Sequence, residues 1–139
     1  MRNNIFRLRP RVFECFLLGG LFVIDQIAKA AFLLQEDRYI RNTGGPWGSD
    51  IPGAFFLVFV PLILLGIMFW WTKERNMSMR LPLVFLLAGG IGNLADRILL
   101  GYVRDFQVMT WFPAFNPADV FLTIGAAWLL LFLAIKKER

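Results

Sequence analysis

Four long apolar segments divide the chain, at about residues 12–34, 54–72, 81–100 and 118–135. Each is close to the ~20 residues that a helix needs to cross a lipid bilayer. The second segment carries no charged residue, and the third becomes polar only near its end. This pattern predicts an all-α membrane protein with four transmembrane helices, which form a single integral membrane domain over residues 1–139.

The basic residues that flank these segments indicate how the chain is oriented. Ten of them fall before the first segment, between the second and third, or after the fourth: Arg2, Arg7, Arg9, Arg11, Lys73, Arg75, Arg80, Lys136, Lys137 and Arg139. The other two loops hold only Arg38, Arg41 and Arg104. Because lysine and arginine accumulate in cytoplasmic loops, we expect both termini in the cytoplasm. The net charge of +5 then reflects orientation, and no nucleic-acid partner is expected.

The composition limits the possible chemistry. Of the 139 residues, 58% are hydrophobic, which is more than a soluble domain of this size can bury. Cys15 is the only cysteine and there is no histidine. A disulfide framework, histidine-based zinc sites and nucleophiles that need a histidine base are therefore excluded. Hydrolytic chemistry must depend on carboxylates, lysine, hydroxyls or the backbone, and no metal or cofactor is expected.

The first segment also has features of a cleavable secretory signal. Basic residues precede an apolar run, and Ala28-Lys29-Ala30 imitates a small-residue cleavage site. Asp25 and Lys29, however, lie where such a signal should be apolar, and three further spans follow. Both interpretations stay open, and the sequence favours a first helix that is retained.

Polar residues in and beside the predicted spans collect toward one membrane face. With the orientation given above, they lie near the outer surface: Asp25, Lys29, Asn42, Asn93, Asp96, Arg97, Asp105 and Asp119. Ionisable groups in a membrane are costly, and by default they mark function or pairing. Glu14 lies in the other half of the first span, and no role is assigned to it. We therefore expect the functional site at the outer face.

Spacing suggests local roles for some of these residues. Asp25 and Lys29 are four positions apart, so they share a helix face and either form a structural ion pair or contact a substrate. In the third segment, Gly89 and Gly92 share a face with the polar residues that follow them. Small residues let a neighbouring helix approach closely, so this face serves either helix packing or a site.

Two further segments have recognisable local chemistry. Asn116 and Pro117 are typical of the cap and the first position of a helix. Asp119 would then lie in the first turn, where the helix dipole favours its charged form. A purely structural role for Asp119 stays open beside a catalytic one. The turn-rich stretch 42–48 fits either an ordinary glycine-rich loop or a platform that holds an extended peptide.

Five motifs occur in order along the chain: Asp25-Gln26-x-x-Lys29, Asn42-x-Gly44, Gly89-Gly90-x-Gly92-Asn93-x-x-Asp96-Arg97, Val103-x-Asp105-Phe106 and Phe115-Asn116-x-Ala118-Asp119. Each motif alone is weak. Together, on four predicted spans of matching topology, they resemble the lipoprotein signal peptidase family, which is also called signal peptidase II. These are bacterial membrane aspartic proteases, and the motifs cover most of the chain.

The resemblance implies an assignment for each matching position. The catalytic pair would be Asp105 and Asp119. Contacts to substrate or inhibitor would come from Asn42, Gly44, Asn93, Arg97 and Asn116. Supporting polar positions would be Asp25, Lys29 and Asp96. It also implies a small extracytoplasmic loop region with short β structure.

The family also implies a reaction and a location. Its members remove the signal peptide from prolipoproteins, N-terminal to the cysteine that carries diacylglycerol, and globomycin-type cyclic peptides inhibit them. For this chain we accordingly expect a monomeric, multi-pass protein of the bacterial inner membrane with its site facing outward. The expected partners are lipidated prolipoproteins, membrane lipids and globomycin-type inhibitors.

The residues suggest a mechanism that agrees with the resemblance. Two neighbouring aspartates share one proton, so one activates water while the other polarises the scissile carbonyl. Asp119, at a helix start, favours the ionised role, although the positive charge of Arg104 next to Asp105 leaves the assignment open. Three alternatives remain: a small transporter or channel, a non-catalytic assembly subunit, and an inactive relative of the peptidases.

Overall fold

The computed structural model describes residues 9–33, 40–44, 51–109 and 112–137 of the chain. Its four helices are α1 (Arg9–Leu33), α2 (Gly53–Lys73), α3 (Met77–Leu100) and α4 (Pro117–Lys137). All four are long and apolar enough to cross a membrane. The prediction of four spans is therefore confirmed, with ends that differ by a few residues; Leu34 lies outside the described residues.

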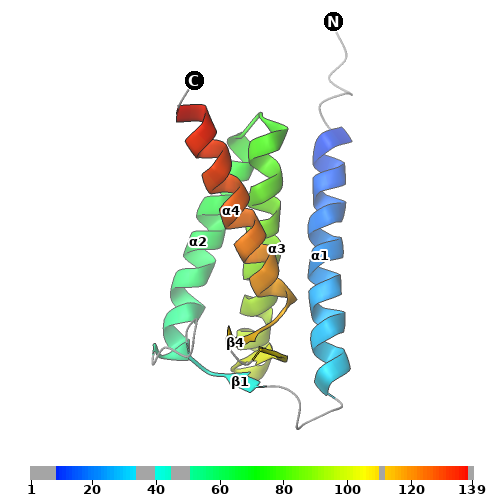
Figure 1. Ribbon diagram of the computed structural model, residues 1–139, viewed down its shortest axis with the longest axis vertical. Coiled ribbons are helices and arrows are strands. Elements are labelled where there is room, and N and C mark those ends of the chain that lie inside the picture. The colour runs from blue at the N-terminus through cyan, green and yellow to red at the C-terminus, as the bar shows by residue number, and fades with distance from the viewer. Residues whose placement is uncertain (1–8, 34–39, 45–50, 110–111, 138–139) are drawn as a thin grey trace, which may run out of the picture.

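The two ends of the bundle differ in structure. All of the strands lie at one end, whereas the first turn of α1 and the last turn of α4 lie at the other (Figure 1). This agrees with the predicted topology, in which an even number of crossings returns the chain to its starting side. The end with the strands is called the strand end below.

α3 is the central helix, and its glycines explain how it contacts the other three. Half of its span is buried, against 11% or less in the other spans. A Cβ atom on Gly89 would collide with the α4 backbone at Ala118, and one on Gly90 would lie 2.6 Å from the side chain of Leu64 on α2. A Cβ atom on Gly92 would lie 2.6 Å from the carboxylate of Asp25 on α1. Each of the three glycines thus admits a different helix.

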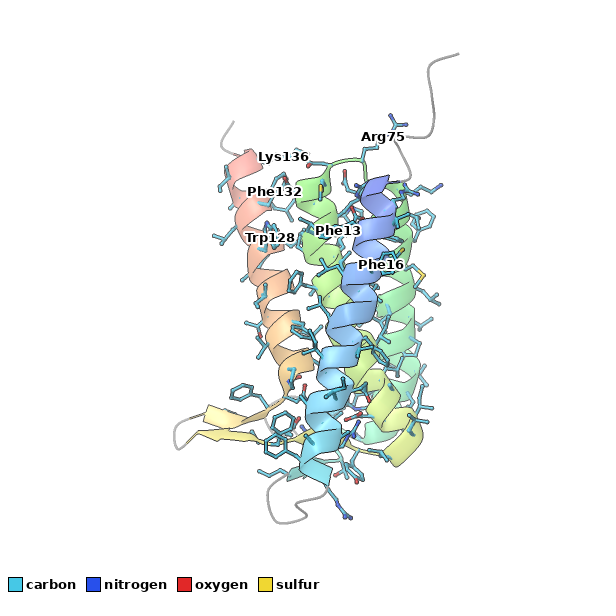
Figure 2. All side chains as sticks on the ribbon, turned by 90° about the vertical axis from the view of Figure 1, so that its right-hand side faces the viewer. Phe13, Phe16, Arg75, Trp128, Phe132 and Lys136 are labelled. Atoms are coloured by element: carbon cyan, nitrogen blue, oxygen red, sulfur yellow. The ribbon has the colours of Figure 1, made fainter. Side chains whose placement is uncertain are left out.

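The outward faces of the helices are apolar, as a bilayer requires. Side chains such as Phe16 and Leu99 are each 76% exposed. Figure 2 shows aromatic side chains of α1 (Phe13 and Phe16) and of α4 (Trp128 and Phe132) toward the end opposite the strands. Exposed apolar surface on this scale would be a liability in water. The fold is therefore that of a multi-pass membrane protein.

Two short antiparallel pairs form the strand end. β1 (Ile40–Asn42) pairs with β2 (Val103–Asp105), so that Ile40 lies opposite Asp105. β3 (Gln107–Met109) pairs with β4 (Phe112–Phe115). The ring of Phe106, between β2 and β3, stacks on Phe32 of α1 with ring centroids 4.2 Å apart. The predicted short β structure is present, and it holds β2 against the bundle.

Candidate active site

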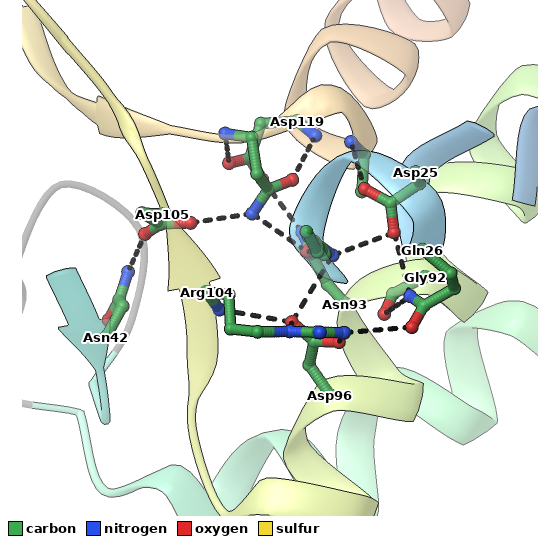
Figure 3. Close-up of polar contacts among 12 residues, drawn as sticks. Asp25, Gln26, Asn42, Gly92, Asn93, Asp96, Arg104, Asp105 and Asp119 are labelled. Atoms are coloured by element: carbon green, nitrogen blue, oxygen red, sulfur yellow. Dashed lines mark hydrogen bonds and ion pairs between the residues drawn. The ribbon is translucent and has the colours of Figure 1, made fainter. Parts of the chain in front are cut away.

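The polar residues singled out from the sequence meet at the strand end (Figure 3). They come from α1, α3, β1, β2 and the start of α4, so five segments distant in sequence contribute to one hydrogen-bonded network. Asp25, Lys29 and Asp96 are fully buried. Asn93, Asp105 and Asn116 are 8%, 3% and 0% exposed. The prediction that these groups gather on one face is therefore correct.

Asp119 is fixed by the local structure of the α4 start. The side-chain oxygen of Asn116 accepts from the Asp119 backbone N–H at 3.1 Å. In return, Asp119 Oδ2 accepts from the Asn116 backbone N–H at 3.1 Å. This reciprocal arrangement is a capping box, and it confirms the predicted cap at Asn116. Both oxygens of the Asp119 carboxylate are then held, because Asn93 donates to Oδ1 at 2.8 Å.

Asn116 also connects the two candidate catalytic carboxylates. Its Nδ2 donates to Asp105 Oδ1 at 2.6 Å and to Asn93 Oδ1 at 3.1 Å. The side-chain NH2 group of Asn116 therefore contacts Asp105 directly. The backbone N–H and the side-chain oxygen of the same residue bind Asp119. The sequence motif placed Asn116 among the contacting residues, and the structure shows that it links the pair.

Asp105 is held from the opposite side by β1. Asn42 Nδ2 donates to Asp105 Oδ2 at 3.0 Å, and Asn42 Oδ1 accepts from the Gly44 N–H at 3.1 Å. Burial raises the pKa of Asp105 to about 6, and the charge of Asp119 acts in the same direction. The hydrogen bonds from Asn42 and Asn116 and the charge of Lys29 oppose this shift. Asp105 can therefore hold a proton under mildly acidic conditions.

Asp25 and Lys29 form the predicted ion pair, with Nζ and Oδ2 2.8 Å apart. Lys29 Nζ also donates to Asn93 Oδ1 at 3.0 Å and lies 3.5 Å from Asp96 Oδ2. Asp25 Oδ1 accepts from the backbone N–H of Ala118 at 2.9 Å, which fastens α4 to α1. The pair connects α1 to α3 and to the start of α4, and it reaches Asp119 through Asn93 rather than by direct contact.

Arg104 lies elsewhere than the sequence suggested. Adjacent side chains on a strand point to opposite faces, so Arg104 turns away from Asp105. Its Nε and Nη2 donate to Asp96 at 3.1 and 2.6 Å, and Nη2 also donates to Gln26 Oε1 at 2.9 Å. Arg104 therefore makes no ion pair with Asp105, and its guanidinium binds Asp96 and Gln26 instead. Arg104 and Gln26 were not predicted as site residues, although strand alternation was a usable signal for Arg104.

A cavity of about 730 Å³ opens beside the network. The side chains that bound it come from α2, α3 and α4, and from β1, β2 and β4. Its polar wall contains Asn42, Asn93, Arg97, Asp105 and Asp119. Apart from Thr123, the rest of its lining is apolar. The apolar lining continues along α2 from Phe56 to Ile67, about 16 Å of helix at 1.5 Å per residue. The cavity therefore joins the two aspartates to an apolar groove.

Arg97 borders the cavity beside the β1 loop. Its Nη2 donates to the Gly44 carbonyl at 3.2 Å, and its guanidinium lies over the ring of Phe56, 4.5 Å from the centroid. Five of the predicted site residues thus line the cavity, while the others support them from behind: Asp25, Lys29, Gly44, Asp96 and Asn116. Within the described residues, no group of three or more acidic or cysteine side chains is arranged to hold a metal.

Comparisons with known proteins agree with this description. A profile of the family described as signal peptidase (SPase) II matches residues 17–135. A lipoprotein signal peptidase of Symbiobacterium thermophilum is 34% identical, over 82% of this chain and 78% of its own. One of Staphylococcus carnosus is 32% identical, over 89% and 91%.

Solved structures show the same architecture. Two bacterial membrane enzymes, both determined by the in meso method, superpose with TM-scores of 0.82 and 0.77. They are 26% and 27% identical in sequence. The first alignment covers 90% of this chain and 89% of the other, and the second covers 87% and 92%.

The four spans together with the family match identify the chain as a membrane aspartic protease. The chain belongs to the signal peptidase II family, whose profile matches most of its length. The resemblance found from the five motifs is therefore confirmed, and the protein is an enzyme.

Proposed function

We propose that this enzyme removes the signal peptide of diacylglyceryl-modified prolipoproteins, cutting N-terminal to the lipidated cysteine. The observation that carries the proposal is the pair of Asp105 and Asp119 on one cavity wall, both bound by Asn116. The matched relatives are named lipoprotein signal peptidases, which supports this class of substrate. No metal or cofactor enters the reaction.

The contacts of the two carboxylates suggest different roles. Asp119 accepts from Asn93 and from a backbone N–H at the start of α4, and both contacts favour the ionised form. Asp105, whose pKa burial raises to about 6, supplies the proton. Asp119 takes a proton from water as the oxygen attacks the scissile carbonyl, while Asp105 protonates the carbonyl oxygen. In the resulting gem-diol one hydroxyl returns its proton to Asp105 as the C–N bond breaks, and the departing amine takes the proton from Asp119, so both aspartates regain their starting states.

The cavity fits a substrate that is partly peptide and partly lipid. Its polar wall offers Asn42, Asn93 and Arg97 to backbone groups of an extended segment, and its apolar length accepts hydrocarbon or an apolar helix. A site at the membrane boundary reaches the cleavage point without extracting the substrate from the bilayer. Globomycin-type inhibitors, being cyclic peptides, would occupy the same space.

The orientation follows from charge. Basic residues concentrate at the end opposite the strands, and the positive-inside rule places that end in the cytoplasm. The strand end then faces outward from the bacterial inner membrane, where the lipidated cysteine of a translocated precursor is found. We expect the enzyme to act as a monomer.

The test is cleavage of a purified diacylglyceryl-modified precursor by Asp105→Asn and Asp119→Asn. Each substitution nearly keeps the size of the side chain, but it removes the titratable proton and replaces one acceptor oxygen by an NH2 donor. We expect kcat to fall by about 10³-fold or more in variants that still show a cooperative unfolding transition. Glu74→Gln, a matched carboxylate at the opposite end, should retain activity. If a variant that combines Asp105→Asn and Asp119→Asn still processes the precursor, and globomycin still blocks this cleavage, the proposed dyad is wrong.

A further inference from the structure

Arg104 ties β2 to two helices by four hydrogen bonds. Its backbone N–H and Nε both donate to Asp96 Oδ2 at 3.1 Å, and Nη2 donates to Asp96 Oδ1 at 2.6 Å. The fourth bond runs from Nη2 to Gln26 Oε1 on α1, at 2.9 Å. Arg104 itself is only 7% exposed. A bidentate arginine–carboxylate pair fixes direction as well as distance.

Arg104 also completes a balance of charge behind the two aspartates. Two acids, Asp25 and Asp96, lie beside two bases, Lys29 and Arg104, in contacts of 2.6 to 3.5 Å. Their side chains are fully buried except that of Arg104, which is 8% exposed. Without Arg104 the group would carry a net negative charge in a buried site. Such a charge acts strongly because little water screens it.

We infer that Arg104 is a positioning residue, which clamps β2 so that Asp105 faces the cavity and neutralises Asp96 behind the catalytic pair. The inference rests on the proposed dyad. Arg104 does not line the cavity, whereas its strand neighbours Val103 and Asp105 do. Its influence therefore passes through β2 and through Asp96, Lys29 and Asn93 to Asp119.

The charged groups around Asp105 determine the sign of the expected effect. They are Asp25 and Lys29 on α1, Asp96 and Arg97 on α3, Arg104 on β2 and Asp119 on α4. The cavity-lining residues of α2 are apolar, and β1 contributes the amide of Asn42. Removing Arg104 deletes one positive charge from this set. Protons should then leave the catalytic pair at higher pH.

The test compares three variants by kcat, KM and pH profile on a diacylglyceryl-modified precursor. Arg104→Met should lower kcat by about tenfold or more, since small displacements of reacting groups are costly. KM should change by less than about threefold, because Arg104 does not border the cavity. The alkaline limb of the profile should move upward by on the order of one pH unit.

Two further variants separate the effect of Arg104 on the position of β2 from the effect of its charge. Arg104→Lys keeps the charge but not the guanidinium geometry, so it should restore the alkaline limb while kcat recovers only in part. Asp96→Asn combined with Arg104→Met removes one charge of each sign. The alkaline limb of its pH profile should lie at the same pH as that of the unmodified enzyme, and its kcat should be low.

Each outcome decides the question. Unchanged kcat in Arg104→Met, or an alkaline limb that does not move, overturns the inference. If Arg104→Met does not yield folded protein, as judged by its unfolding transition in detergent, the charge-balanced double variant takes its place. An unmodified kcat in that variant also overturns the inference. If both Asp→Asn variants lose cleavage while Arg104→Met is unaffected, the role of Arg104 is refuted. The proposed dyad is then left intact.

Discussion

At the end opposite the strands, Glu14 is fully buried and makes an ion pair with Arg80 at 2.8 Å. The indole N–H of Trp71 donates to its other oxygen at 2.7 Å, so α1, α2 and α3 meet at one carboxylate. At the strand end, Asp105 is also buried and Asp119 is half-buried on the cavity wall, but their contacts are of another kind. Their side-chain partners are amides, supplied by Asn42, Asn93 and Asn116.

The difference distinguishes a carboxylate that holds helices together from one that can react. A buried carboxylate paired with arginine is kept ionised, and its proton is not available. A carboxylate bound by neutral amides keeps its position without a fixed charge state, so it can gain or lose a proton. Among the described residues, neither Asp105 nor Asp119 has a cationic side chain within ion-pair distance. Lys29 and Arg104 contact Asp25 and Asp96 instead.

The largest expected effect tests the first half of this comparison. Arg80→Ala leaves Glu14 buried without its cation, which should lower the free energy of unfolding by about 3 kcal/mol. Arg75→Ala removes an exposed arginine at the same end and should change it by less than about 0.5 kcal/mol. Unfolding by a denaturing detergent, followed by circular dichroism, measures both.

Cleavage activity is a second measurement on the same two variants. Because the Glu14 ion pair lies at the opposite end of the bundle from Asp105 and Asp119, cleavage per folded molecule should be unchanged in both variants. A drop in kcat for folded Arg80→Ala would mean that the two ends are coupled. Equal stability of Arg80→Ala and Arg75→Ala would show that the Glu14 ion pair contributes nothing to holding the helices.

A smaller effect is expected from adding one methyl group at the strand end. In Gly92→Ala the new Cβ would lie 2.6 Å from Asp25 Oδ2 and 3.3 Å from the Ala118 Cβ. Relief requires Asp25 to move, and this carboxylate already binds Lys29 and the start of α4. We expect a loss of about 2 kcal/mol in stability, with a reduced kcat.

Gly19→Ala is the matched control in α1. A Cβ atom at Gly19 would meet nothing within 4 Å, so the substitution should leave stability unchanged or raise it by up to about 1 kcal/mol. The same unfolding measurement applies to both glycine variants. Equal behaviour of the two would refute the close approach of α1 and α3 at Gly92.

Much of the fold and of the site was predictable because it depends on local patterns. Hydropathy alone gave the four spans, and the spacing of Asp25 and Lys29 gave their ion pair. The capping role of Asn116 followed from residue types at a helix start. In each case the partners lie within a few residues of one another or within one continuous apolar run.

The unpredicted contacts join distant parts of the chain. Glu14 meets Arg80 and Trp71, which no pattern around residue 14 indicates. Arg104 was judged from its sequence neighbour Asp105, but strand geometry separates the two side chains and directs Arg104 to Asp96. Adjacent positions on a strand face opposite ways, so sequence proximity was misleading there.

The pH dependence of cleavage tests the second half of the comparison, that the strand end holds a carboxylate with a mobile proton. The pKa of Asp105 is raised from 3.8 to about 6, first by burial and then by the charge of Asp119. If Asp105 must be protonated, kcat/KM should fall as pH rises through about 6. Well above that value the fall should approach about tenfold per pH unit. A profile that is flat or rising between pH 6 and 8 would contradict this role for Asp105.

Stability should change with pH in the same region. The folded state binds more protons than the unfolded state between the ordinary pKa of 3.8 and the raised value of about 6. The free energy of unfolding should therefore decrease as pH rises across this window, by on the order of 2 kcal/mol. Asp105→Asn, which has no proton to lose there, should lack this decrease. Its stability should match that of the unmodified enzyme near pH 4 and exceed it above pH 6, because only the unmodified chain must then bury an ionised carboxylate beside Asp119.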